Sequence, residues 1–299
     1  MLVLLALGGF AACGPRSDDG QNDGGSSDGS VADGHVWWDG GVGSDGGNPC
    51  EPPDMLIVLD RTMSMHRQPN GDPAPQGSHE LSKWVLAIDA IEVVTAAYDL
   101  RIRFGLELFP RDPADGSCVT LTERIAGTTA TNVICEEGEV LVSPGVGTSG
   151  AIDTAMDPEV TLLCGSTPIG AGLDTALVHL SGVADPIRDQ YALLVTDGQD
   201  TCTTPDPVER VQALAAAGVS TYVVGFDASG TGVDPVTLNN MACAGMTAPD
   251  HAQTCVDQGG GAYVAVDPTG APLFLSASDG AELAAQLDTV ASAVGCVVE

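Results

Sequence analysis

Two apolar runs that end at an acidic residue mark strands of a parallel sheet. Residues 55–59 are large and apolar without polar alternation, and Asp60 follows them directly. Residues 191–196 repeat the pattern and end at Asp197. A strand that is apolar on both faces is typical of a parallel sheet that helices cover on both sides. Ligands of such sheets collect beyond the carboxyl ends of the strands, so Asp60 and Asp197 lie where a binding site is expected.

Helical and strand patterns alternate along residues 50–299, which predicts a doubly wound α/β fold with a mostly parallel central sheet flanked by helices. Helices are predicted at residues 81–98, 169–180, 208–217, 235–244 and 281–294. Further strands are predicted at residues 101–109, 219–226 and 261–266. Because residues 101–109 alternate polar and apolar positions, we expect this strand to be half exposed, with Arg101 and Arg103 facing solvent. Residues 111–163 are predicted to be a loop-rich insertion.

Three hydroxyl side chains could bind a ligand together with the two acids. Thr62 and Ser64 follow Asp60 in the loop after the first strand, and Thr167 stands at a predicted helix start before Pro168. With Asp197, these residues offer only oxygen donors and two formal negative charges, which suits Mg²⁺, or alternatively Mn²⁺ or Ca²⁺. A softer metal would require His or Cys. The alternative for Asp60 is a purely structural helix N-cap.

The motifs Asp60-x-Thr62-x-Ser64, Thr167-Pro168-x-Gly170 and Thr196-Asp197-Gly198 resemble the metal-ion-dependent adhesion site of von Willebrand factor A domains. That family usually has Asp-x-Ser-x-Ser, and Thr62 keeps the hydroxyl while adding a methyl group. The resemblance covers roughly residues 50–299 and implies the Rossmann-like fold of the family. It implies a divalent cation held by a set of five residues. These are Asp60, Thr62, Ser64, Thr167 and Asp197.

In that family the cation binds a protein partner, whose carboxylate completes the coordination shell, and the loops around the metal select the partner. The resemblance therefore implies adhesion or protein–protein interaction and no enzymatic activity. A phosphatase of the haloacid dehalogenase type is the enzymatic alternative, but such enzymes have a second Asp where this chain has Thr62, and a late lysine that this chain lacks. A structural surface protein without a metal ion is a further alternative.

Charge excludes one class of partner. The chain has a formal net charge of −31 and a sequence pI of about 4.1, so it would repel the phosphates of nucleic acid. Lys83 is the only lysine. Its isolation argues against enzymes that depend on a lysine base or a lysine phosphate clamp.

The N-terminus has the features of an exported protein. Residues 1–12 are apolar but too short to span a bilayer, and Phe10-Ala11-Ala12-Cys13 resembles the lipobox of bacterial lipoproteins. We expect residues 1–13 to be a signal peptide with lipidation at Cys13, and residues 14–49, rich in Gly, Ser and Asp, to be a disordered tether. These features predict a lipid-anchored protein of the bacterial cell envelope, at the outer membrane or cell surface. A plain signal peptide is the alternative.

The remaining cysteines form an even set that is available for disulfides in an oxidising compartment. We expect pairs that clasp the domain ends, close two short loops and link the Thr167 loop to the Asp197 loop. These pairs are Cys50–Cys296, Cys118–Cys135, Cys243–Cys255 and Cys164–Cys202. A zinc site is the competing use, but the chain has no Cys-x-x-Cys spacing.

Overall fold

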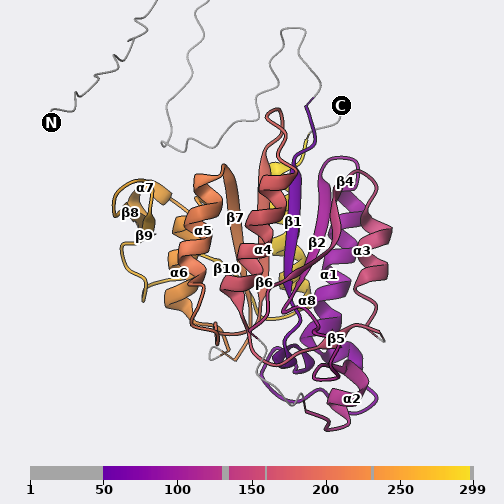
Figure 1. Ribbon diagram of the computed structural model, residues 1–299. Coiled ribbons are helices and arrows are strands. Elements are labelled where there is room, and N and C mark those ends of the chain that lie inside the picture. Colours follow the sequence, from indigo (N-terminus) through magenta and orange to yellow (C-terminus); the bar gives the residue numbers. More distant parts are fainter. Residues whose placement is uncertain (1–49, 130–134, 159, 230–231, 297–299) are drawn as a thin grey trace, which may run out of the picture. The chain divides into compact units, whose positions relative to one another are not determined.

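The computed structural model describes residues 50–129, 135–158, 160–229 and 232–296 (Figure 1). A six-stranded sheet in the order β10-β7-β6-β1-β2-β4 forms its centre. Neighbouring strands are parallel except for β4, which runs antiparallel to β2 at one edge. The strands are β1 (Asp54–Asp60), β2 (Arg103–Phe109), β4 (Glu139–Gly145), β6 (Gln190–Thr196), β7 (Val219–Phe226) and β10 (Leu275–Ala277).

Helices cover both faces of this sheet, and each face has its own apolar core. In Figure 1, α4 (Ile169–Gly182), α5 (Pro207–Ala216) and α6 (Pro235–Ala244) lie in front of the sheet. The opposite face packs on α1 (Lys83–Tyr98), α3 (Ser149–Ala155) and α8 (Gly280–Val294). The predicted doubly wound α/β fold is therefore confirmed. Among the described residues, no helix combines the length and apolar character that crossing a membrane requires.

The shorter elements lie in the connections. They are η1 (Met63–His66), η2 (His79–Leu81), β3 (Val119–Thr120), α2 (Leu121–Ile125), β5 (Leu162–Leu163), α7 (His251–Thr254), β8 (Cys255–Asp257) and β9 (Tyr263–Ala265). The predicted insertion at residues 111–163 contains β3, α2, β4, α3 and β5, so part of it joins the central sheet through β4. The strand predicted at residues 261–266 is instead β9, which pairs only with β8, and the sheet edge is formed by β10.

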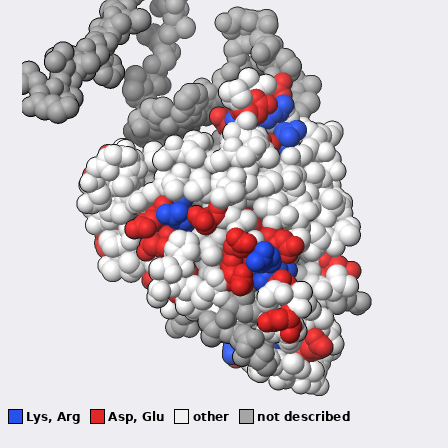
Figure 2. Space-filling view, in the orientation of Figure 1, with Lys and Arg blue, Asp and Glu red and all other residues white. Residues whose placement is uncertain are grey.

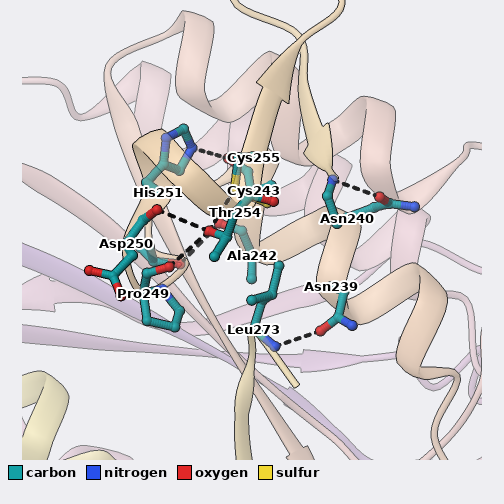
Figure 3. The surroundings of a disulfide bond; sticks show 12 residues. Asn239, Asn240, Ala242, Cys243, Pro249, Asp250, His251, Thr254, Cys255 and Leu273 are labelled. Atoms are coloured by element: carbon teal, nitrogen blue, oxygen red, sulfur yellow. Dashed lines mark hydrogen bonds between the residues drawn. A yellow bond between two sulfur atoms is a disulfide. The ribbon is translucent and has the colours of Figure 1, made fainter. Parts of the chain in front are cut away.

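A disulfide organises the segment that contains β8 and β9. Cys243 of α6 is bonded to Cys255, the first residue of β8 (Figure 3). His251 Nε2 lies 2.9 Å from the Cys243 carbonyl oxygen, and Asn240 Oδ1 accepts a hydrogen bond from the Ala265 amide at 3.0 Å. These contacts fasten the small β8–β9 sheet to α6.

Two of the predicted disulfides are confirmed, and two are wrong. Cys50–Cys296 and Cys243–Cys255 are present as expected. Instead of Cys118–Cys135 and Cys164–Cys202, the bonds are Cys118–Cys164 and Cys135–Cys202. The reason is that β3 pairs antiparallel with β5, which brings Cys118 beside Cys164 and leaves Cys135 to reach the loop after β6. Closeness in the sequence therefore predicted Cys243–Cys255 correctly and Cys118–Cys135 wrongly.

The expectation that β2 is half exposed is also wrong. The strand lies between β1 and β4, and it is buried from Phe104 to Phe109. Arg103 forms an ion pair with Asp54, its Nε lying 2.6 Å from Oδ1. The polar residue that interrupts the apolar pattern, Glu107, is fully buried.

Glu107 is an acid without a charged or hydrogen-bonding partner among the described residues. Its side chain lies against Gly138, where an added Cβ would come within 1.9 Å of Glu107 Oε1. The Gly138 amide donates to Thr175 Oγ1 of α4 at 3.0 Å, so this contact lies under the helix. Burial raises the pKa of Glu107 well above its ordinary value of 4.5. Burial therefore favours the neutral form of this carboxyl group in the folded protein.

We expect the variant Glu107→Gln to be more stable than the wild type at pH 8 and similar to it near pH 4. Above pH 4.5 the unfolded chain releases the Glu107 proton while the folded chain retains it, so wild-type stability falls as the pH rises. Each unit by which the folded-state pKa is raised corresponds to about 1.4 kcal/mol. Urea unfolding between pH 4 and pH 8 measures the difference. The control Glu92→Gln, on the exposed side of α1, should show no such pH-dependent gain. Parallel curves for wild type and Glu107→Gln would contradict the assignment.

Candidate functional site

Asp60 is held by the loop that follows it and by the neighbouring strand. It is the last residue of β1 and is fully buried. Its Oδ1 accepts a hydrogen bond from the Thr62 amide at 2.8 Å, and its Oδ2 accepts one from Thr196 Oγ1 at 2.7 Å. Because β1 and β6 run parallel with Leu59 opposite Val195, Thr196 comes next to Asp60. The carboxylate orientation is therefore fixed by backbone register.

Ser64 joins the two acidic strand ends. Its hydroxyl oxygen lies 2.8 Å from Thr62 Oγ1 and donates to Asp197 Oδ1 at 2.7 Å. Ser64 belongs to the short helix η1, whose first turn brings the hydroxyl back toward the sheet. Of the residues predicted from the sequence, Asp60, Thr62, Ser64 and Asp197 thus form one hydrogen-bonded cluster at the carboxyl ends of β1 and β6.

Thr167 approaches the same cluster from a third loop. Its amide donates to Thr201 Oγ1 at 2.7 Å, and its carbonyl accepts from the Thr201 amide at 3.0 Å. A Cβ added at Gly198 would lie 3.3 Å from Thr167 Oγ1, so the hydroxyl packs against the residue that follows Asp197. The absence of a side chain at Gly198 therefore permits this close approach. All five predicted site residues therefore lie at or beyond the carboxyl ends of the central strands.

Asp200 fixes the helix that begins beside Thr167. The residue before α4 is Pro168, which provides no side-chain cap. Asp200 replaces that cap from the other loop, because its Oδ1 accepts a hydrogen bond from the Ile169 amide at 2.9 Å. Desolvation raises the pKa of Asp200 to about 6, although hydrogen bonds from the backbone amides of Ile169, Cys202 and Gly170 oppose the rise. The two loops that supply Thr167 and Asp197 are therefore held together by capping as well as by backbone pairing.

Lys83 also belongs to this cluster, although the sequence motifs did not assign it to the site. Its Nζ lies 2.5 Å from Asp197 Oδ2, and the two side chains are 3% and 0% exposed. Lys83 is the first residue of α1, directly after the N-cap Ser82. The available signal was its position: the only lysine of the chain begins a largely apolar helix, just after the loop that carries Thr62 and Ser64.

Burial raises the pKa of both acids in this cluster, and the charges of neighbouring groups raise or lower it further. Desolvation raises the pKa of Asp60 to about 7, and the nearby Asp197 contributes to the rise. Desolvation also raises the pKa of Asp197, whereas Lys83 and the Ser64 hydrogen bond lower it. Asp227, at the end of β7, adds a further negative charge that acts on Asp197. The cluster has more acidic than basic groups, so a bound cation would stabilise it.

The donor set fits a hard divalent cation. Carboxylate and hydroxyl oxygens from three loops lie together, and the oxygens that already accept hydrogen bonds retain further lone pairs. Oxygen donors of this kind suit Mg²⁺, Mn²⁺ or Ca²⁺. The Lys83 ammonium group at Asp197 Oδ2 is the one feature that opposes a cation there.

A second cluster of metal-ligand types does not form a site. Asp112 lies near the sulfur atoms of Cys118 and Cys164. Because these two cysteines form a disulfide, neither sulfur is available as a thiolate ligand.

Comparison with known proteins agrees with this geometry. Residues 152–257 match the family model of the von Willebrand factor type A domain. The matched segment contains Thr167 and Asp197 and begins after Asp60, Thr62 and Ser64. A comparison with curated protein sequences gives no match.

Solved structures share the fold. The pilus adhesin SpaC from Lactobacillus rhamnosus GG, in its open conformation, has a TM-score of 0.52 at 13% identity, over 82% of this chain and 30% of the adhesin. Proximal thread matrix protein 1 from the mussel byssus, in crystal form 2, has a TM-score of 0.51 at 15% identity, over 82% of this chain and 49% of that chain. The same byssus protein with a zinc-occupied metal-ion-dependent adhesion site has a TM-score of 0.50 at 16% identity, over 83% and 48%.

The chain thus spans less than half the length of these solved structures, and at such identities the likeness is one of fold. The match over residues 152–257 and the shared fold make this chain similar to von Willebrand factor type A domains.

We expect Asp200→Ala to destabilise the domain by about 1 kcal/mol, the usual cost of losing a helix cap. The matched control is Asp206→Ala, because Asp206 Oδ1 caps α5 by accepting from the Val208 and Glu209 amides at 2.9 and 3.0 Å. Both variants should unfold at lower urea concentration. Only Asp200→Ala should accelerate hydrogen exchange of the Ile169 amide, measured by NMR. Unchanged exchange at Ile169 would refute the capping role.

Proposed function

We propose that this domain binds a protein partner through a divalent cation held by Asp60, Thr62, Ser64, Thr167 and Asp197. The observation that supports the proposal is the hydrogen-bonded chain from Asp60 through Thr62 and Ser64 to Asp197, which gathers oxygen donors from separate loops at the carboxyl edge of the sheet. Carboxylates and hydroxyls are the ligands that hard cations prefer. The bound cation supplies a positive charge that attracts a carboxylate of the partner.

Each residue of the chain has a separate role in this proposal. Asp60 and Asp197 supply the negative charge, and Thr62, Ser64 and Thr167 supply neutral oxygens. Thr196 and the Thr62 amide orient Asp60, while Asp200 holds the start of α4 next to Thr167. If one of the two carboxylates acts through a water molecule, the ion retains net positive character. A carboxylate from an Asp or Glu of the partner is then the favoured last ligand.

The location of the domain is also part of the proposal. The lipobox-like segment ending at Cys13, which lies outside the described residues, favours a lipid anchor in the bacterial cell envelope. The predicted tether at residues 14–49, also outside the described residues, would hold the domain away from the membrane. The disulfides Cys50–Cys296, Cys118–Cys164, Cys135–Cys202 and Cys243–Cys255 favour an oxidising compartment.

A structural role without a metal ion is the alternative that one observation favours. The ion pair between Lys83 and Asp197 already neutralises part of the negative charge of the site. In that alternative the cluster would serve only to hold the three loops together. A hydrolase is less favoured, because the buried Lys83 is engaged with Asp197.

We expect Mg²⁺ to bind the wild-type domain and to raise its melting temperature, and Asp197→Asn to abolish both effects. Asparagine keeps the size of the side chain but removes the charge that attracts the ion. A ligand present at 100 times its dissociation constant stabilises a folded protein by about 2.7 kcal/mol. Isothermal titration calorimetry and thermal unfolding, with and without EDTA, provide the measurements.

The control for this experiment is Asp89→Asn, an acid on the exposed side of α1. It should bind Mg²⁺ as the wild type does. Equal responses of wild type, Asp197→Asn and Asp89→Asn would contradict the proposed site. Partner binding is tested by cross-linking the domain to a bacterial envelope fraction. EDTA added before the cross-linker should prevent the cross-linked species from forming.

A further inference from the structure

Lys83 is buried next to the candidate metal ligands. Among charged side chains, lysine is rarely buried completely unless it is paired. Here the pair is short, with 2.5 Å between Lys83 Nζ and Asp197 Oδ2, and both side chains are almost inaccessible to solvent. Lys83 therefore places its ammonium group inside the site.

The backbone around Lys83 fixes the origin of this side chain. Ser82 caps α1 by accepting a hydrogen bond from the Val85 amide at 3.3 Å, and the Lys83 amide donates to the Arg67 carbonyl at 2.7 Å. Trp84, the next residue, is fully buried. The start of α1 is thus anchored, whereas the four-carbon stem of the lysine side chain contains several rotatable bonds.

An ammonium group and a divalent cation cannot share Asp197 without cost. A cation bound by the Asp197 carboxylate would lie a few Å from Lys83 Nζ, in a buried place where repulsion between like charges is strong. The two positive groups therefore compete for the same carboxylate. The ion pair joins Lys83 to Asp197 and not to Asp60, whose oxygens accept hydrogen bonds from Thr62 and Thr196.

We propose that Lys83 is a tethered cation that keeps the site assembled when no metal ion is bound and leaves Asp197 when a metal ion binds. The inference rests on the proposed metal-dependent function and adds a determinant of its affinity. The competition lowers the affinity of the site for Mg²⁺, because each binding event has to break the Lys83–Asp197 ion pair.

A nearby acid offers Lys83 a second position. Asp227 follows β7 directly; desolvation opposes the lowering of its pKa, hydrogen bonds from Gly232 and Ser229 lower it, and the charge of Lys83 makes a smaller contribution. Asp227 Oδ1 accepts hydrogen bonds from the Ser229 amide at 3.2 Å and from Ser229 Oγ at 2.8 Å, which keeps the carboxylate in place. We therefore expect the ammonium group to move toward Asp227 when it leaves Asp197.

The single lysine makes a direct test possible in the unmodified protein. Lysine labelled with ¹³C gives one side-chain signal for residue 83, since the chain has no other lysine. Titration with Mg²⁺ should shift the Lys83 Cε signal in step with the binding heat measured by calorimetry. Binding heat without any shift of this signal would overturn the inference while leaving the proposed metal site intact.

The variant Lys83→Met tests the competition. It keeps an unbranched side chain of similar length and removes the charge, so the affinity for Mg²⁺ should rise by about tenfold or more. In EDTA the same variant should melt at a lower temperature than the wild type, because Asp197 loses its buried partner. The control Arg67→Met removes an exposed positive charge next to η1 and should change neither quantity.

The outcomes separate the two proposals. Equal Mg²⁺ affinities of wild type and Lys83→Met would refute the tethered cation alone. Binding by Lys83→Met together with none by the wild type would refute both the release of Lys83 by the ion and the binding of Mg²⁺ by the wild-type domain. If neither protein binds Mg²⁺, both proposals fail. If Lys83→Met does not fold, the Lys83 Cε signal of the wild type decides.

Discussion

The structure around the site depends on burying two carboxylates at the ends of neighbouring parallel strands. Asp60 and Asp197 lie beyond β1 and β6, and both are almost completely buried. Removing charges from water is costly unless hydrogen bonds and opposite charges compensate for it. Thr62, Ser64, Thr196 and Lys83 supply that compensation. These partners come from β6 and from the segment between β1 and α1, so the acids determine how this part of the chain folds.

Two disulfides stabilise the loops around the site at the carboxyl ends of the strands. Cys118–Cys164 joins β3 to the segment just before Thr167, and Cys135–Cys202 joins the predicted insertion to the loop that carries Thr201 and Asp200. Because cross-links restrict the unfolded chain and limit loop movement, they favour a site that is assembled before any ligand arrives. The predicted insertion is thereby fixed next to the residues that would meet a partner. This position is consistent with the proposal that these segments select the partner.

The sequence was informative where a local pattern decides the structure. The strand at residues 219–226 and the helix at residues 235–244 have the predicted bounds, because each has a continuous apolar or periodic pattern between turn signals. Glu107 misled the assignment of β2, since a buried acid between apolar residues produces the same alternation as a half-exposed strand. The sequence motifs placed Asp60 and Asp197 at one edge of the sheet. Lys83 could not be assigned in this way, because its contact depends on how α1 approaches that edge.

Long-range charge and short-range chemistry have opposite effects on a partner with a carboxylate. The chain has a formal net charge of −31, which repels acidic proteins at a distance. On the face shown in Figure 2, basic side chains lie beside acidic ones, so this face offers no separate basic patch among its described residues. At physiological salt the repulsion is screened beyond about 8 Å. Attraction must therefore arise within a few Å of the site, where a cation, whether a metal ion or Lys83, faces Asp197. In the proposed function, specificity for a carboxylate would depend on how much of that positive charge remains unneutralised.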